Sequence, residues 1–266
     1  MTADGGRTAE LKLPALADAV VLPWDSAISK SKHVYGFDSL DPRSRPFNMM
    51  RAKLHELRHE RRWRLFGVVS ATPKVGKSFI TANLAASLSR DPQFETTAVD
   101  LDLRLASLTT LFGIDPKVGI RAYLENRPSA QVPTAYALAG ERLTIWPTVA
   151  GAVRSAELLA NSRAEAMLQA MRASPANRLF MIDLPPVFAN DDAATVLKRL
   201  DAYLVVAEEG RTTQRELRDV IDLLGSDQLA GVVLNKYRGG LVSEGYGVDH
   251  YYAAGYGTTE PGDDLR

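Results

Sequence analysis

Residues 65–78 read Leu-Phe-Gly-Val-Val-Ser-Ala-Thr-Pro-Lys-Val-Gly-Lys-Ser, an apolar run followed by a loop that ends in Gly-Lys-Ser. The residues after it, Phe79 to Leu88, have the composition of a helix, so the stretch predicts a strand, a phosphate-binding loop and a helix in that order. Successive backbone N–H groups and the start of a helix form an anion site. Gly76 lets the backbone approach phosphates, Lys77 reaches the β- and γ-phosphates, and the Ser78 hydroxyl is a Mg²⁺ ligand.

The loop predicts a nucleotide site that is lined by Thr72, Pro73, Lys74, Val75, Gly76, Lys77, Ser78 and Phe79. Two positions depart from the usual pattern, because Ala71 replaces the first glycine and Lys74 stands where glycine is common. A lysine at position 74 either crowds the phosphates or adds a positive charge to them. A chance Gly-Lys-Ser at the start of a helix is the alternative, and the correctly placed strand and helix argue against it.

Further short apolar runs alternate with helical segments along the chain. Their hydrophobicity is nearly continuous, as in strands that are buried on both faces. Strands separated by helices favour a parallel sheet, so the sequence predicts an α/β fold, a P-loop NTPase with a mostly parallel central sheet flanked by helices. The predicted strands are Leu65–Ser70, Thr97–Asp100, Leu143–Trp146, Leu179–Asp183, Tyr203–Ala207 and Gly231–Asn235.

Carboxylates end two of these strands. Asp100 and Asp102 follow one apolar run, and Asp183 ends another. Because the ends of parallel strands meet at one edge of a sheet, where open α/β folds bind ligands, we expect these groups beside the phosphate loop. Mg²⁺ prefers such oxygen ligands. A single aspartate at a strand end is more often a helix cap or turn residue, but three in this order favour a metal and nucleotide site.

The rest of the chain divides into three predicted parts. Residues 1–45 lack sustained periodicity and are predicted to be a partly disordered arm. Residues 46–237 form the nucleotide-binding domain, whose first helix carries Phe47, Met50, Leu54 and Leu57 on one face and a basic opposite face. That basic face is either simply solvated or a contact surface for a partner subunit or phosphate. Residues 238–266, rich in Gly and Tyr, are predicted to be a flexible tail.

Composition limits the functions that are open to the chain. The 266 residues carry 32 basic and 32 acidic side chains, so no overall field draws the protein to nucleic acid or to an anionic membrane. The absence of cysteine excludes disulfides and thiolate metal sites. No apolar run approaches the ~18 residues of a membrane span. We therefore expect a cytoplasmic protein that is not inserted in a membrane, although a partner can hold it at the inner membrane.

Taken together, these motifs resemble those of the bacterial tyrosine kinases, P-loop autokinases of capsular and exopolysaccharide biosynthesis. Asp100, Asp102 and Arg104 match the Asp-x-Asp-x-Arg pattern of that family, and Asp183 with Pro186 matches its Asp-x-x-Pro pattern. Three further segments resemble segments of the family, namely Gly119–Leu124, Ser155–Leu159 and Gly231–Asn235. The whole resemblance covers roughly residues 40–256.

The resemblance implies tyrosine autophosphorylation by ATP and Mg²⁺. It places Lys77 on the transferring phosphoryl group, Asp100 near the incoming hydroxyl as base or orienter, and Asp102 and Asp183, with Ser78, on the metal ion. Arg104 and Asn235 are implied as nucleotide contacts. The implied phosphoacceptors are Tyr246, Tyr251, Tyr252 and Tyr256.

The family also implies partners. A separate membrane-spanning polysaccharide chain-length regulator would recruit this stand-alone type, and a Glu-x-x-Arg-x-x-Arg motif would build a ring of copies. The matching positions here are Arg45, Asn48 and Arg51, so only the last arginine of the motif is kept. The altered motif therefore argues against the family's standard ring and leaves a homo-oligomer of another kind open.

Two alternative functions stay open. The chain could be an ATPase of the plasmid-partition and septum-placement type, but those carry a lysine five residues before the loop lysine, where this chain has Thr72. It could also be a nucleotide switch without kinase activity that regulates polysaccharide export, an alternative that Lys74 and the altered oligomer motif favour.

Overall fold

The computed structural model describes residues 11–151, 154–189 and 192–237. Within these ranges an eight-stranded sheet runs in the order β1-β4-β5-β3-β6-β2-β7-β8, and every neighbouring pair is parallel except β4 and β5. This confirms the predicted α/β class and the mostly parallel sheet. The strands are β1 (Val20–Leu22), β2 (Leu65–Val69), β3 (Glu95–Asp100), β4 (Tyr136–Leu138), β5 (Leu143–Trp146), β6 (Arg178–Asp183), β7 (Ala202–Glu208) and β8 (Leu229–Asn235).

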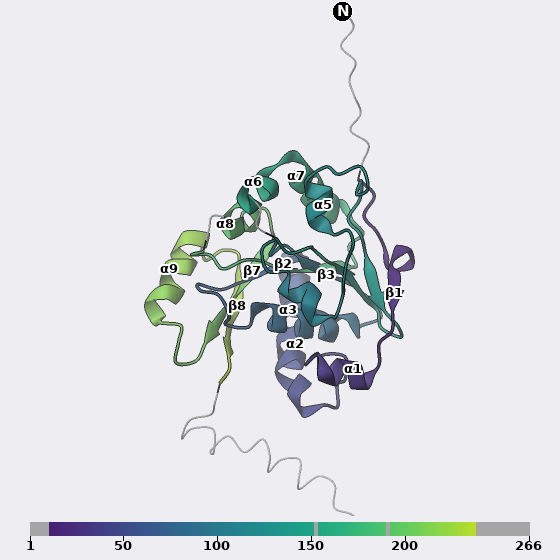
Figure 1. Ribbon diagram of the computed structural model, residues 1–266. Helices are drawn as coiled ribbons and strands as arrows, with labels where there is room; N and C mark the ends of the chain where they lie inside the picture. Colours follow the sequence, from purple (N-terminus) through teal and green to yellow (C-terminus); the bar gives the residue numbers. More distant parts are fainter. Residues whose placement is uncertain (1–10, 152–153, 190–191, 238–266) are drawn as a thin grey trace, which may run out of the picture. The chain divides into compact units, whose positions relative to one another are not determined.

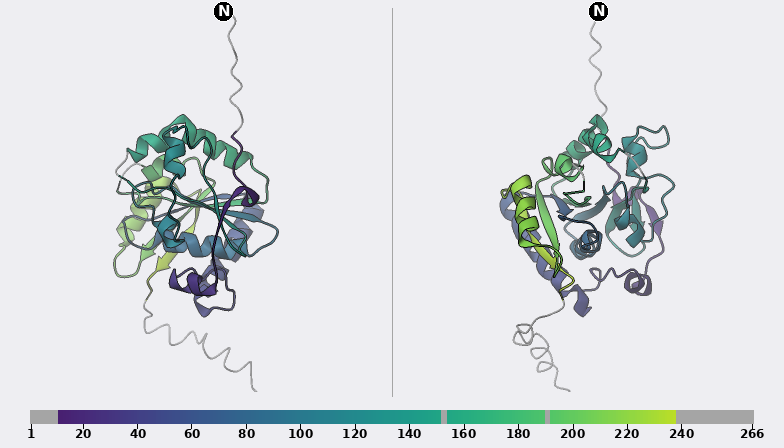
Figure 2. Two further views of the ribbon diagram at one scale, coloured as in Figure 1. Left: turned by 45° about the vertical axis from the view of Figure 1, so that its right-hand side comes forward. Right: turned by 60° about the vertical axis from the view of Figure 1, so that its left-hand side comes forward.

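Helices cover both faces of this sheet (Figures 1 and 2). One apolar core is shared with helices α5 to α9, through side chains such as Tyr123, Met167 and Val220. The other core lies against α2, α3 and α4, through side chains such as Phe47 and Leu84. The helices are α1 (Ser26–Ser31), α2 (Arg45–Arg61), α3 (Lys77–Ser89), α4 (Ser107–Leu111), α5 (Ile120–Leu124), α6 (Ser155–Ala160), α7 (Ser162–Ala173), α8 (Asp192–Leu197) and α9 (Gln214–Leu224), with short 3₁₀ turns at Leu16–Asp18 and Pro42–Ser44.

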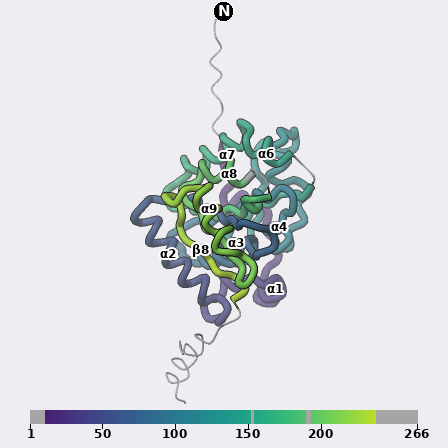
Figure 3. The backbone as a smooth tube through the Cα atoms, turned by 90° about the vertical axis from the view of Figure 1, so that its left-hand side faces the viewer, coloured from purple at the N-terminus to yellow at the C-terminus, as the bar shows by residue number. Residues whose placement is uncertain are grey.

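All six strands that the sequence predicts are present, and β1 and β4 were not predicted. Both missed strands have only three residues, too few for a hydrophobic pattern to stand out. The expectation of burial on both faces is wrong for β8, where Val232 is 44% and Leu234 is 54% exposed. The reason is position, because β8 is the last strand of the sheet and Figure 3 shows it with α9 in front of the other strands.

The prediction that residues 1–45 form an arm is corrected for the part that the structure describes. Val20–Leu22 add a strand to the sheet by pairing in parallel with β4. Trp24 and Val34 are buried in the core that α2 and α3 share. No strand was predicted here because the apolar run Ala19–Leu22 is short and lies between Asp18 and Pro23, and tertiary contacts order the segment.

Three further points bear on the expectations from sequence. No helix of the described ranges is long and apolar enough to cross a membrane. Helix α9 begins with a capping box of the Thr-x-x-Glu pattern, in which Thr213 accepts from the Glu216 N–H and the Glu216 carboxylate accepts from the Thr213 N–H. The four predicted phosphoacceptors, Tyr246, Tyr251, Tyr252 and Tyr256, lie outside the described residues, as does the rest of the predicted tail from residue 238.

Candidate functional site

The phosphate loop joins β2 to α3 near the middle of the sheet. Gly76 is the N-cap of α3 with φ +97°, and Lys74 also takes a left-handed backbone conformation with φ +66°. Side chains with a Cβ rarely adopt this conformation. Lys74 therefore carries a backbone strain that glycine would avoid. Lys77, the first residue of α3, is buried with 6% of its surface exposed.

Asn235, the last residue of β8, is hydrogen-bonded to this loop. Its Nδ2 donates a hydrogen bond to the Val75 carbonyl over 2.8 Å. The same atom would lie 2.1 Å from a Cβ added to Gly76, so glycine is required both by the backbone angle and by the space. The resemblance implied that Asn235 contacts the nucleotide, and the structure places it directly against the loop that would hold the phosphates.

Asp183 ends β6 beside the start of α3. The Ser78 hydroxyl donates to one carboxylate oxygen over 2.5 Å, and the Thr81 hydroxyl lies 3.4 Å from the other. Burial raises the pKa of Asp183 to about 6, while the Lys77 charge and the Ser78 hydrogen bond act in the opposite direction. The predicted metal ligands Ser78 and Asp183 are therefore in direct contact.

Asp100 lies next to Asp183, because the two residues pair in the register of β3 and β6. Its carboxylate accepts hydrogen bonds from the Thr109 N–H at 2.8 Å and from the Thr109 hydroxyl at 2.7 Å. The Asp102 N–H donates to its other oxygen over 3.2 Å. Burial, together with the Asp183 carboxylate, raises the pKa of Asp100 well above its usual range. Asp100 is thus a fully enclosed group in this conformation.

The remaining predicted residues take different positions. Asp102 is buried and accepts from the Leu105 N–H over 3.1 Å, so it also shapes the turn after β3. Arg104 donates from Nε to the Ser155 hydroxyl over 2.9 Å, which links the turn to α6. The Phe79 ring packs edge-on against Phe47, with 5.7 Å between ring centroids. The Phe79 side chain thus takes part in an aromatic contact between α3 and α2.

The chemistry of these donors fits Mg²⁺. The ion prefers hard oxygen ligands, takes only one or two carboxylates, and keeps waters and phosphate oxygens in the other positions. Ser78 and Asp183 supply such a pair at one point. In the described ranges no three acidic or imidazole side chains converge into a complete metal cage. The arrangement fits an ion that is shared with a nucleotide rather than one held by protein alone.

Two functional neighbours were missed from the sequence. Thr109 holds Asp100 through two hydrogen bonds, and its hydroxyl accepts from the Thr148 N–H over 3.0 Å. Thr81 stands one turn after Lys77 and donates to the Lys77 carbonyl over 3.0 Å. No motif marks Thr109, because its contact depends on how α4 packs against the end of β3. For Thr81, the only sequence signal of its contact with Asp183 was its position one turn after Lys77 in the predicted helix.

Comparison with known proteins identifies a nucleotide-binding family. Residues 66–246 match the family described as the CobQ/CobB/MinD/ParA nucleotide binding domain. The chain is 32% identical over 229 residues to the putative tyrosine-protein kinase EpsB of Ralstonia nicotianae, an alignment that covers 83% of this chain and 30% of EpsB. It is 30% identical over 179 residues to the succinoglycan biosynthesis transport protein ExoP of Rhizobium meliloti, covering 65% of this chain and 22% of ExoP.

Among solved structures, the kinase domain of the Escherichia coli tyrosine kinase ETK superposes with a TM-score of 0.68 at 21% identity. The superposition covers 83% of this chain and 92% of that domain. At this identity the likeness establishes the fold. The chain spans less than a third of the length of the two curated relatives named above.

Proposed function

This chain belongs to the family of CobQ/CobB/MinD/ParA nucleotide binding domains, and from that premise we propose that it is an ATP- and Mg²⁺-dependent protein-tyrosine autokinase that regulates exopolysaccharide or capsule polymerisation and export. The observation that carries the proposal is the contact between the phosphate loop and the acidic strand ends, with the Ser78 hydroxyl on Asp183 and Asp100 beside it. The names of its relatives, a putative tyrosine-protein kinase and a succinoglycan biosynthesis transport protein, support the reaction and the setting.

In the proposed reaction the phosphate loop holds the β- and γ-phosphates of ATP. Lys77 places its ammonium group on them, and Ser78, Asp102 and Asp183 hold Mg²⁺ directly or through water. The bound ion would neutralise charge on the transferring phosphoryl group. The tyrosine oxygen bonds to the γ-phosphorus as the bond to the bridging oxygen breaks, so ADP leaves and the phenol proton is released.

Asp100 is proposed to receive that proton or to orient the hydroxyl. Both of its oxygens are engaged in this conformation, one by Thr109 and one by the Asp102 N–H. A role as base therefore requires the carboxylate to turn away from Thr109. Orienting the hydroxyl has the same requirement, whereas in this conformation Asp100 accepts from the Asp102 N–H and so holds the turn that carries Asp102.

The proposed acceptors are Tyr246, Tyr251, Tyr252 and Tyr256. The two tyrosines in the core make poor alternatives for steric reasons. The Tyr123 hydroxyl donates to the Arg163 carbonyl over 3.1 Å, and the Tyr203 hydroxyl donates to the Gly225 carbonyl over 2.6 Å. Both side chains are at least 98% buried.

The proposed partner is a membrane-spanning chain-length regulator that holds the chain at the cytoplasmic side of the inner membrane. For self-association, α2 keeps only the last arginine, Arg51, of the family's ring motif. Arg51 donates to the Ser87 carbonyl over 3.3 Å, and the Asn48 side-chain oxygen accepts from Arg90. These two motif positions are thus bound to α3 and to its C-cap residue Arg90 in the same chain, so any homo-oligomer is proposed to use another surface.

The direct test is incubation of the purified chain with ATP and Mg²⁺, followed by detection of phosphotyrosine. The assay is run alone and with the cytoplasmic segment of a candidate membrane partner, and Lys77→Met is the control. Phosphotyrosine in the parent chain and none in the control is the expected result. Nucleotide binding without phosphotyrosine under either condition would replace the kinase proposal by a nucleotide switch.

A further inference from the structure

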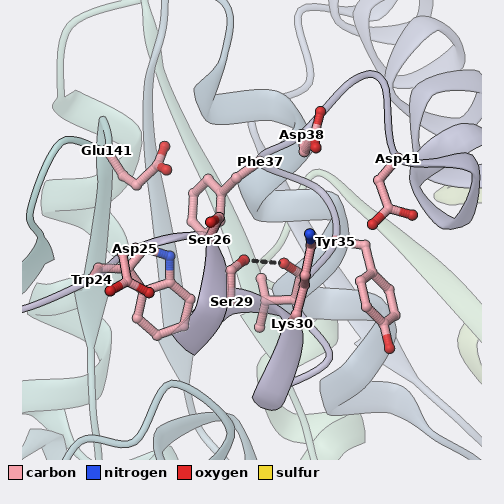
Figure 4. A pocket seen from close by; sticks show the side chains of 11 residues that line it. Trp24, Asp25, Ser26, Ser29, Lys30, Tyr35, Phe37, Asp38, Asp41 and Glu141 are labelled. Carbon is pink, nitrogen blue, oxygen red and sulfur yellow. Dashed lines mark hydrogen bonds between the residues drawn. The ribbon is translucent and has the colours of Figure 1, made fainter.

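A pocket of about 290 Å³ lies between α1, the segment that leads to α2, and the turn between β4 and β5 (Figure 4). Trp24, Phe37 and Val34 give it apolar walls. The rings of Trp24 and Phe37 meet edge to face, with their centroids 6.0 Å apart. The volume is at the small end of ligand sites, which suits one long side chain rather than a nucleotide.

The rim of this pocket is acidic. Asp25, Asp38, Asp41 and Glu141 line it, and Lys30 is the one cation among the residues that do so. Asp41 is already neutralised, because Arg43 forms an ion pair with it at 2.6 Å. Asp25 caps α1 by accepting from the Ile28 N–H over 2.8 Å, and Asp38 accepts from the Leu40 N–H over 2.9 Å. These are backbone contacts, which leave both negative charges in place.

Glu141 differs from the other three acids because no group of the described residues compensates its burial. It is half-buried in the turn between β4 and β5, and burial raises the pKa of its carboxyl. No hydrogen bond or ion pair of its carboxylate occurs within the described residues. A partly buried carboxylate without a partner is destabilising, and a cation placed beside it would remove that cost.

Trp24 provides a second, independent unsatisfied group. The side chain is 9% exposed, and its buried indole N–H finds no acceptor within the described residues. In Figure 4 the indole nitrogen lies on the edge of the ring that points toward Glu141. A buried donor without an acceptor costs about as much as a lost hydrogen bond. One pocket therefore lacks both a cation for its carboxylate and an acceptor for its indole.

The segment His33–Gly36, which lines the pocket, is hydrogen-bonded to the helix that follows the phosphate loop. The N–H groups of Tyr35 and Gly36 donate to the Asn83 side-chain oxygen over 2.6 and 3.1 Å. Asn83 lies on α3, and its Nδ2 donates back to the His33 carbonyl over 3.0 Å. A Cβ on Gly36 would stand 2.0 Å from the Asn83 carbonyl. The segment that lines the pocket is thus hydrogen-bonded to α3, the helix that starts at Lys77.

We propose that this pocket, the acidic pocket between Trp24 and Glu141, binds an arginine side chain from a basic segment of a partner protein. The planar guanidinium matches a carboxylate and packs on aromatic faces, whereas an ammonium group does neither as well. The main chain of the segment supplies the carbonyl that accepts from the Trp24 N–H. A free polyamine carries no hydrogen-bond acceptor for the Trp24 N–H. A peptide supplies both that acceptor and a cation for Glu141, so the pocket favours a peptide. The proposal does not depend on kinase activity.

The test uses the ¹⁵N-labelled full chain, whose three tryptophans give three indole N–H resonances. Trp24→Phe identifies the Trp24 signal. The probe is N-acetyl-Gly-Arg-Gly-amide, and the matched probe carries citrulline, which has the shape of arginine without its charge. The expected result is a saturable shift of the Trp24 signal with the arginine peptide, with affinity weaker by at least about fivefold for the citrulline peptide.

Two variants make the result specific. Glu141→Gln keeps the size of the side chain and removes its charge, and it is expected to weaken the arginine peptide by at least about fivefold. Glu60→Gln, at an exposed position on α2, is expected to leave the affinity unchanged. The proposal is overturned if the citrulline peptide or spermidine shifts the Trp24 signal at the same concentrations. It is equally overturned if Glu141→Gln has no effect, or if no shift saturates by about 10 mM peptide.

Discussion

Gly76→Ala tests how the phosphate loop is held. The substitution adds one methyl group at a residue with φ +97°, and that methyl would stand 2.1 Å from the Asn235 Nδ2. Asn235 therefore has to swing away, and its 2.8 Å hydrogen bond to the Val75 carbonyl is lost. The loop then loses both its favoured backbone conformation and its attachment to β8.

The expected magnitude follows from these two effects. A left-handed backbone costs a residue with a Cβ about 1–2 kcal/mol. The lost hydrogen bond adds about 0.5–1.5 kcal/mol. Gly76→Ala should thus lower the free energy of unfolding by about 2–3 kcal/mol. Gly210→Ala is the matched control, because Gly210 also has a positive φ, of +70°, but no atom within 4 Å of an added Cβ. It should show the backbone cost alone, about 1–2 kcal/mol.

Urea denaturation of four proteins completes the assay: the parent chain, Gly76→Ala, Asn235→Ala and the double variant. In the Asn235→Ala background the added methyl meets no side chain, so the hydrogen bond is lost only once in the cycle. The double variant should therefore be more stable than the sum of the single effects predicts, by about 1 kcal/mol. Single effects that add within about 0.3 kcal/mol would refute the contact between Asn235 and Gly76.

Three further outcomes are expected at the same site. Lys77→Met should remove most of the affinity for ATP–Mg²⁺ in calorimetry, since it deletes the buried charge of the loop, and unchanged affinity would contradict the assignment. Asp100→Asn and Asp183→Asn should reduce the rate of autophosphorylation far more than the affinity for nucleotide, because these carboxylates act on the metal ion and the acceptor. Full activity in both variants would mean that the two carboxylates have only a structural role at the strand ends. The third outcome concerns pH. Folding raises the pKa of Asp183 from 3.8 to about 6, so its contribution to stability is complete below pH 3.8 and is lost as the pH rises through 6. Without Mg²⁺, Asp183→Asn should therefore gain stability relative to the parent chain between about pH 4 and pH 6, by up to about 3 kcal/mol, and a parallel pH dependence of the two proteins would contradict it.

The sequence predicted the strands that carry the site because their side chains are buried on both faces. β2, β3 and β6 read as apolar runs, and the loop and aspartates that follow them are recognisable from residue type alone. The order of these three strands in the sheet, β3-β6-β2, was not predicted, because parallel strands share one carboxyl edge in any order. What could not be predicted was which hydrogen bonds the aspartates make, because Thr109 and Thr81 come from helices whose packing no local pattern encodes.

The N-terminal segment shows the opposite case. Val20 and Val21 are more than half exposed although they form a strand. Trp24 and Val34 become buried only because the segment packs against α2, α3 and the β4–β5 hairpin. Such a segment carries no period that a helix or a buried strand would show. The pocket between Trp24 and Glu141 depends on this packing, because its two unsatisfied groups lie more than 100 positions apart in the chain.

Position-resolved mapping of phosphate after incubation with ATP and Mg²⁺ tests the central claim, phosphoryl transfer to tyrosine, most directly. The parent chain should carry phosphate among Tyr246, Tyr251, Tyr252 and Tyr256, and the variant with all four changed to Phe should carry almost none. Lys77→Met should carry none in either form. Phosphate confined to Tyr123 or Tyr203, whose hydroxyls are bound to main-chain carbonyls, or no phosphotyrosine even with the cytoplasmic segment of a membrane partner, would contradict the account.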